Sequence, residues 1–158
     1  MNILFAGEGG QGVQAIAQIL AKAAFLEGYS PLYIPNFGVE QRGGVSLAFL
    51  VINKNNPACY PKFEKADMVA ILAERSVKRV QRYIDSKTIV ILGPALKGGL
   101  KTNLPPKVWN VLILGKINQK GKIVKIDNLI QALNERFAKS YVKTPFLKQI
   151  NLQAIKAC

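Results

Sequence analysis

The sequence contains no histidine, which removes the commonest general base and the commonest protein ligand for transition metals. Its two cysteines, Cys59 and Cys158, are too few for the four thiolates that usually hold an iron–sulfur cluster, and no CxxC motif is present. We interpret both as free thiols in a reducing compartment. These absences predict a chain with no catalytic residue, no metal site and no redox centre of its own.

Long hydrophobic runs are also missing, although 49% of the residues are hydrophobic. The apolar runs at residues 66–73 and 111–114 are far shorter than the ~20 residues that span a bilayer. The chain begins Met1-Asn2 and continues directly into an apolar segment, without the basic region or small-residue cleavage site of a signal peptide. We therefore expect a cytoplasmic protein that makes no membrane contact.

Acidic residues are scarce: 9 Asp and Glu stand against 22 Lys and Arg, for a net charge of +13. Such an excess predicts an anionic partner. The lysines from Lys97 onward are scattered, whereas Arg75, Lys78, Arg79 and Arg82 have the spacing of one helix face. A solvated helix surface is the simplest interpretation of that cluster, and an acidic protein partner is the second. Nucleic acid is the least favoured, because its binders usually combine a basic patch with aromatic residues.

The order of predicted elements points to one α/β domain. Residues 2–6 form an apolar run typical of a buried parallel strand, and residues 13–27 show helical spacing that stops at Gly28. Further strands are expected at 30–35, 45–53, 67–72 and 88–92, and helices at 76–84, at 128–138 with Asp127 as cap, and from Pro145. Residues 108–117 fit either a strand or a buried helix. The predicted fold is a single doubly wound domain, residues 1–158, with a mostly parallel sheet and a Gly-rich strand-to-helix turn.

The glycine-rich turn Gly7-Glu8-Gly9-Gly10-Gln11-Gly12 formally matches a dinucleotide fingerprint. Two details weaken that match: Glu8 would repel a pyrophosphate, and no acid follows the second strand to hold a ribose, since Glu27 falls at the end of the helix. A purely structural turn and contact with an anionic ligand or partner chain both remain open. A free-standing dinucleotide-binding module is the alternative from another functional class.

A second motif, Phe37-Gly38-Val39-Glu40-Gln41-Arg42-Gly43-Gly44-Val45-Ser46, follows the second predicted strand. The carboxyl ends of strands are where open α/β sheets bind ligands. Arg42 could bind a carboxylate or phosphate through two parallel hydrogen bonds. The alternative is a Glu40–Arg42 ion pair within a surface loop, which would contribute little stability.

Together the two motifs resemble one family, the gamma domain of the 2-oxoacid:ferredoxin oxidoreductases. The matching residues are Gly7-x-Gly9-Gly10-Gln11-Gly12-Val13 and Phe37-Gly38-x-Glu40-x-Arg42-Gly43-Gly44. Tyr60-Pro61, Ala66-Asp67, Asn110 before Leu114-Gly115, and Asn151 with Ala154 extend the resemblance over nearly the whole chain. The segment between Gly93 and Val108 is shorter than in the family. The resemblance implies that residues 108–117 are helical.

The resemblance implies a subunit without its own redox centre in an assembly that converts a 2-oxoacid, coenzyme A and oxidised ferredoxin into acyl-CoA, carbon dioxide and reduced ferredoxin. Thiamine diphosphate and iron–sulfur clusters would lie on partner subunits: alpha/beta-type subunits for the thiamine cofactor and a ferredoxin-type subunit for the clusters. Residues 43–46 are most similar to the 2-oxoglutarate branch, and residues 40–44 also to indolepyruvate enzymes, so the 2-oxoacid stays open. The residues expected at a coenzyme A site are Gly7, Gly9, Gly10, Gln11, Gly12, Glu40, Arg42, Gly43 and Gly44.

Overall fold

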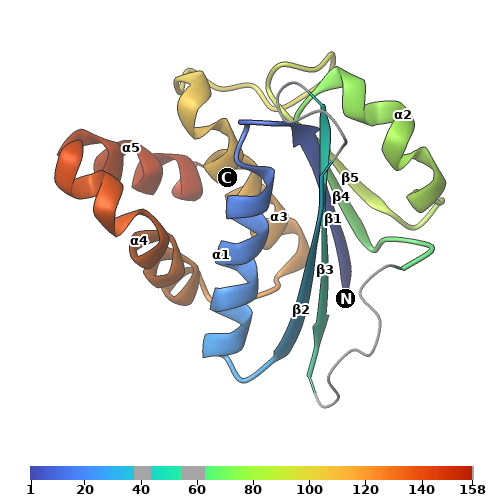
Figure 1. Cartoon of the computed structure of the whole chain (residues 1–158), viewed down its shortest axis with the longest axis horizontal. Coiled ribbons are helices and arrows are strands. Elements are labelled where there is room, and N and C mark those ends of the chain that lie inside the picture. The colour runs from blue at the N-terminus through green and yellow to red at the C-terminus, as the bar shows by residue number, and fades with distance from the viewer. Residues whose placement is uncertain (38–43, 55–62, 158) are drawn as a thin grey trace.

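The computed structural model describes residues 1–37, 44–54 and 63–157. Within them, five strands form one sheet in the order β2-β3-β1-β4-β5 (Figure 1). The strands are β1 Asn2–Glu8, β2 Ser30–Phe37, β3 Val45–Asn53, β4 Met68–Ile71 and β5 Ile89–Leu92. β1, β4 and β5 are parallel, whereas β3 is antiparallel to both β1 and β2. The α/β class is confirmed, and the sheet is mixed because the connection from β2 to β3 is too short for a parallel crossover.

Helices cover both faces of the sheet (Figure 1). α1 and α3 pack on one face, and α4 and α5 pack against α1 and α3 as an outer layer. α2, with a 3-10 turn on each side, covers the other face. The helices are α1 Val13–Leu26, α2 Val77–Val80, α3 Trp109–Gly121, α4 Ile126–Lys143 and α5 Pro145–Lys156, and the 3-10 turns are Glu74–Ser76, Gln81–Tyr83 and Pro106–Val108. The helix implied for residues 108–117 is confirmed.

The two faces of the sheet have separate hydrophobic cores, and β1 contributes to both. Ile3 and Phe5 belong to the core under α1 and α3, whereas Leu4 and Ala6 belong to the core under α2. This alternation follows from the two-residue period of a strand. It also explains why residues 2–6 are apolar throughout: both faces of this central strand are buried.

Glycine closes the C-terminus of α1. Gly28, with φ +81°, donates its N–H to the carbonyl oxygen of Phe25, and Tyr29 donates to that of Ala24, which is the paired closure that glycine permits at a helix C-terminus.

Glu27, at the end of α1, is hydrogen-bonded to the start of α4. The expectation that Asp127 caps α4 is wrong, because the helix begins at Ile126, one residue before Asp127. Glu27 Oε1 accepts the N–H of Lys125 and, at 3.0 Å, the side-chain amide of Asn128. Asp127 lies in the first turn instead.

No helix in the described ranges is long and apolar enough to cross a membrane.

Candidate functional site

The glycine turn is held in shape by its own hydrogen bonds. Gln11 donates its backbone N–H to the carbonyl oxygen of Glu8 at 3.1 Å, and its side-chain Oε1 accepts the N–H of Glu8 at 2.9 Å. Gly10 and Gly12 have φ of +96° and +77°, a region in which residues with a Cβ are strained. The turn therefore requires glycine at these two positions for backbone reasons alone.

Two glycines of the turn are also required by close packing. A Cβ at Gly7 would lie 2.7 Å from both Gln11 Oε1 and Val13 Cγ2, and a Cβ at Gly12 would collide with the side-chain amide of Asn110. Asn110 lies in the first turn of α3. The glycine spacing thus allows the start of α1 and the start of α3 to approach each other closely.

The two sequence motifs meet at one backbone hydrogen bond. Gly9 donates its N–H to the carbonyl oxygen of Gly44 at 3.0 Å, directly beyond the β1–β3 pair of Glu8 with Val45. The structure therefore places Gly44 beside the glycine turn. Glu40, Arg42 and Gly43 lie outside the described residues, as do Cys59 and Cys158.

A partly buried polar network fixes the first turn of α1 to the sheet. Gln14 donates its Nε2 to Ser46 Oγ at 2.8 Å and to the carbonyl oxygen of Leu47 at 3.0 Å, and its Oε1 accepts the hydroxyl of Tyr33 at 2.6 Å. Burial raises the pKa of Tyr33, while a side-chain hydrogen bond with Gln18 lowers it. The turn and the start of α1 are therefore held rigidly against β2 and β3.

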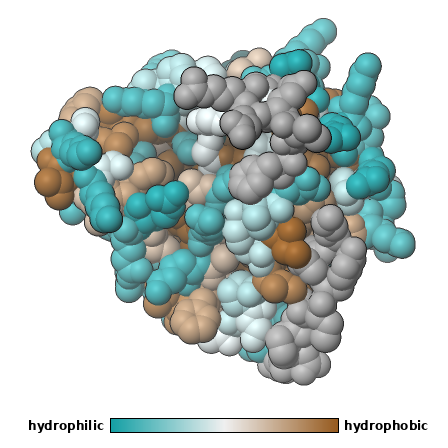
Figure 2. Space-filling model, in the orientation of Figure 1, coloured by the Kyte–Doolittle hydropathy of each residue, from teal (hydrophilic) through white to brown (hydrophobic). Residues whose placement is uncertain are grey.

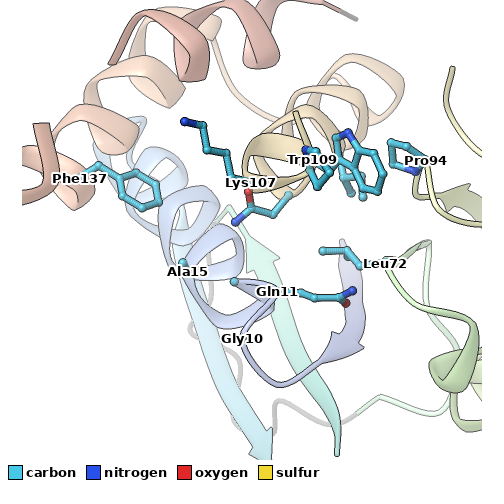
Figure 3. A pocket seen from close by; sticks show the side chains of 12 residues that line it. Gly10, Gln11, Ala15, Leu72, Pro94, Lys107, Trp109 and Phe137 are labelled. Carbon is cyan, nitrogen blue, oxygen red and sulfur yellow. The ribbon is translucent and has the colours of Figure 1, made fainter. Parts of the chain in front are cut away.

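A cavity of about 290 Å³ opens beside the turn, between the start of α1 and the start of α3 (Figure 3). Its described lining comprises Gly10, Gln11, Gly12, Ala15, Leu72, Pro94, Pro106, Lys107, Trp109, Asn110, Ile113 and Phe137. Figure 3 shows Phe137 on one side and Trp109 with Pro94 on the other, with Gly10 and Gln11 beneath them. The volume lies at the lower end of the range for small-molecule sites, roughly 300–1,000 Å³.

The electrostatics of this cavity favour an anion. Neither α1 nor α3 has an acidic residue in its first turn, and both helices begin at the cavity. At the start of α3, Trp109 donates its backbone N–H to Pro106 and Val111 donates to the side-chain oxygen of Asn110 at 2.9 Å. The start of α1 and the dipoles of both helices therefore supply the partial positive charge. Lys107 adds a full positive charge beside the start of α3. The positive end of the helix dipole repels that charge, and a bound anion would offset the repulsion. No acidic side chain, Glu8 included, is among the described lining residues.

The cavity also has an aromatic wall. Trp109 donates its indole N–H to the carbonyl oxygen of Leu104 at 2.8 Å, so its polar atom is satisfied away from the ligand space. Phe137 packs on Tyr141 with ring centroids 6.1 Å apart. The arrangement suits a ligand with both an anionic group and an apolar or planar part.

The sequence identified part of this site. Of the predicted residues, Gly10, Gln11 and Gly12 line the cavity, Gly7 and Gly9 build the turn behind it, and Gly44 contacts Gly9. Lys107, Trp109 and Phe137 also line the cavity and were missed by the sequence analysis. The start of the helix at 108–117 was a usable signal for the first two, because a second helix start points to the same edge. Nothing local marks Phe137, which belongs to α4.

The dinucleotide interpretation loses its structural basis. β2 is an edge strand separated from β1 by antiparallel β3, so β1, α1 and β2 do not form the adjacent parallel unit of a dinucleotide fold. Glu27, the residue at a suitable sequence distance for the ribose, is bonded to Lys125 and Asn128. Within the described ranges, no group of three or more His, Cys, Asp or Glu residues is placed to hold a metal ion.

Comparison with known proteins identifies relatives over most of the chain. Pyruvate synthase subunit PorC of Methanothermobacter marburgensis is 33% identical over 153 residues, covering 87% of this chain and 86% of that protein. The 2-oxoglutarate synthase subunit KorC of Archaeoglobus fulgidus is 31% identical over 96 residues, covering 61% of this chain and 51% of that protein.

Solved structures show the same fold. The keto/oxoacid ferredoxin oxidoreductase gamma subunit from Geobacter sulfurreducens has a TM-score of 0.76 at 18% identity, covering 98% of this chain and 94% of that one. The 2-oxoglutarate:ferredoxin oxidoreductase from Magnetococcus marinus has a TM-score of 0.83 at 18% identity, covering 99% of this chain and 30% of that chain. A family model described as pyruvate ferredoxin/flavodoxin oxidoreductase matches residues 2–158, and the chain therefore belongs to that family as a gamma-type member.

Proposed function

We propose that the chain is the gamma subunit of a multisubunit 2-oxoacid:ferredoxin oxidoreductase and that its glycine-turn cavity forms part of the coenzyme A site. The complex would convert a 2-oxoacid, coenzyme A and oxidised ferredoxin into acyl-CoA, carbon dioxide and reduced ferredoxin. The observation that carries the proposal is the convergence of the start of α1, the positive end of the α3 dipole and Lys107 on one cavity. Coenzyme A is a substrate with several phosphates and a planar base, which suits this combination of positive charge and aromatic wall.

The chain's part in the reaction would be to bind and position. Lys107 is the one ionisable side chain among the described lining residues. The start of α1 and the Lys107 ammonium group would hold phosphate oxygens, and Trp109 would exclude water from one side. Thiamine diphosphate and the iron–sulfur clusters would lie on thiamine-binding alpha/beta-type subunits and a ferredoxin-type subunit, with ferredoxin as acceptor. The solved Magnetococcus marinus enzyme is described with coenzyme A bound, which supports the substrate class.

The 2-oxoacid is open. Residues 43–46 favour 2-oxoglutarate and residues 40–44 also resemble indolepyruvate enzymes, whereas a relative that matches over most of its length is a pyruvate synthase subunit. Turnover of the purified complex with each acid would decide between them, because the preferred substrate should show the higher kcat/KM.

Lys107→Ala in the assembled complex tests the coenzyme A role. Loss of one charge-assisted contact should raise KM for coenzyme A by about tenfold with little change in kcat. Lys120→Ala, an exposed lysine at the far end of α3, is the matched control and should leave KM unchanged. An unchanged KM in Lys107→Ala would remove the cavity from the coenzyme A site.

The subunit role has a separate test. An affinity tag on the thiamine-binding partner should co-purify the untagged gamma chain in stoichiometric amount. A gamma chain that never associates with such partners, yet binds NAD, NADP or FAD at micromolar concentration, would instead be the free-standing dinucleotide module.

A further inference from the structure

A group of basic side chains lies on the opposite face of the sheet from α1 and α3. Arg75, Lys78, Arg79 and Arg82 are all exposed on α2 and its flanking 3-10 turns. Among the described elements, these turns and α2 are what covers that face (Figure 1), and Figure 2 shows hydrophilic side chains projecting from that side of the molecule. None of these residues lines the cavity beside α1, so the proposed coenzyme A role does not involve this surface.

The composition of the cluster differs from the rest of the chain. The protein has 17 lysines but only five arginines, and three of those five fall between residues 75 and 82. Arginine is enriched at protein interfaces, because its planar guanidinium binds carboxylates through two hydrogen bonds, whereas lysine is depleted there. A helix surface that only needs to be solvated has no such preference for arginine.

Arg82 is held in place before any partner arrives. Its guanidinium lies 4.7 Å from the centroid of the Tyr83 ring and donates to the Tyr83 hydroxyl. Tyr83 is itself fixed, because it is buried and packs edge-to-face on Phe49 and Phe63 with centroid distances of 5.3 and 6.3 Å. A charged group that is already ordered loses less conformational entropy on binding.

Lys65 extends the positive surface. Its Nζ donates to the carbonyl oxygens of Arg82 at 3.0 Å and Ile84 at 3.2 Å, at the end of the second 3-10 turn. Lys78 and Arg79 form no ion pair with another residue in the described ranges. Asp85 interacts electrostatically with Lys65, so the charge that a partner could use is centred on Lys78 and Arg79.

An apolar residue lies on the same side of the sheet. On edge strand β5, Ile91 faces the core under α3, and Leu92 packs against the core under α2. The two-residue period of the strand puts Val90 on the α2 side with Leu92, and Val90 is 39% exposed. Apolar surface with charged residues around it is the usual anatomy of a protein–protein interface.

We propose that this surface, defined as Lys65, Arg75, Lys78, Arg79, Arg82 and Val90, docks a carboxylate-rich surface of another subunit of the same oxidoreductase complex. Charge complementarity and preorganised arginine favour an acidic protein. Nucleic acid fits less well, because Tyr83, the aromatic residue within the cluster, is buried and offers no face to a base. The inference rests on the proposed subunit role but not on the coenzyme A cavity, which lies on the other side of the sheet.

The test is Lys78→Glu/Arg79→Glu in the complex co-expressed with a tagged thiamine-binding subunit. Both side chains are exposed, so the fold should persist, which circular dichroism of the purified variant would verify. Lys139→Glu/Lys143→Glu on α4 makes the same charge change at exposed positions and is the control. Titrating each gamma chain into gamma-depleted complex should give at least about a tenfold higher Kd for the α2 variant, with the difference shrinking as salt is raised.

The outcomes separate the two proposals. If the wild-type chain fails to associate, the subunit role fails. If wild-type and α2 variant associate equally, or the α4 control weakens binding as much, the docking surface is wrong and the effect is one of net charge. Retained assembly with loss of single-stranded DNA binding in the α2 variant would identify a nucleic-acid surface and overturn the proposal. Arg79→Lys keeps the charge but not the planar fork, so it should bind more tightly than the charge-reversed variant and more weakly than wild type.

Discussion

Gly12 directly precedes α1, and the side chain of Asn110 lies against it. Gly12→Ala should destabilise the fold for two reasons: a φ of +77° costs about 1–2 kcal/mol for a residue with a Cβ, and that Cβ collides with the Asn110 amide. Urea unfolding of the variant should show a lower midpoint with an unchanged slope.

Gly28→Ala separates the two causes. Gly28 has a similar φ of +81°, but a Cβ there meets nothing within 4 Å, so this variant should lose only the backbone part. In the Gly12 variant, adding Asn110→Ala should restore part of the stability, a coupling expected for residues in contact. Equal losses in the two glycine variants, with no coupling to Asn110, would contradict the collision.

At the scale of residues, the sequence predicted contacts that lie within one motif. Gly10, Gln11 and Gly12 were identified because backbone constraints at a strand-to-helix turn leave a glycine pattern in consecutive positions. Lys107 and Phe137 approach the cavity from distant parts of the chain. An ordinary lysine before a helix and an apolar residue on a helix face carry no local sign of which cavity they will reach.

α3 and α5 approach each other at Gly115, where a Cβ would lie 2.5 Å from the carbonyl oxygen of Ile155. Alanine normally stabilises a helix interior by up to about 1 kcal/mol relative to glycine. Gly115→Ala should do the opposite, because the atom it meets is backbone and α5 would have to move, at a cost of about 1–3 kcal/mol.

Thermal unfolding would measure this effect. Lys120→Ala on the exposed side of α3 is the control and should change the Tm little. A Gly115→Ala variant more stable than wild type would show that α5 shifts freely, and that the α3–α5 contact does not constrain the start of α3 at the cavity.

At the scale of elements, strands and helices were predicted well where the apolar period was unambiguous. The mixed sheet was not predicted. The apolar pattern of residues 45–53 shows that both faces of this strand are buried, but it does not show whether the neighbouring strands run parallel or antiparallel to it. The cap of α4 was missed for a related reason. Glu27 lies about a hundred residues before the helix it caps, and a local search for capping residues finds only Asp127.

The charge distribution of the whole molecule predicts a response to salt. Residues 86–126 contain eight lysines and no acidic residue. A net charge of +13 destabilises the compact state by self-repulsion. Sodium chloride between about 20 and 200 mM should therefore raise the Tm of the purified chain, because it screens that repulsion.

Phosphate should stabilise the chain more than chloride does at equal ionic strength, because it can also bind in the cavity that the start of α1 and Lys107 both line. Phosphate also favours compact states of any protein by its exclusion from the surface. Lys107→Ala distinguishes the two effects: exclusion is the same in variant and wild type, whereas specific binding is weakened. The difference in Tm between phosphate and chloride should therefore shrink in Lys107→Ala and stay unchanged in Lys120→Ala. Identical differences in all three proteins would mean that the cavity binds no phosphate, and that the positive charge around it serves only the contact with neighbouring chains.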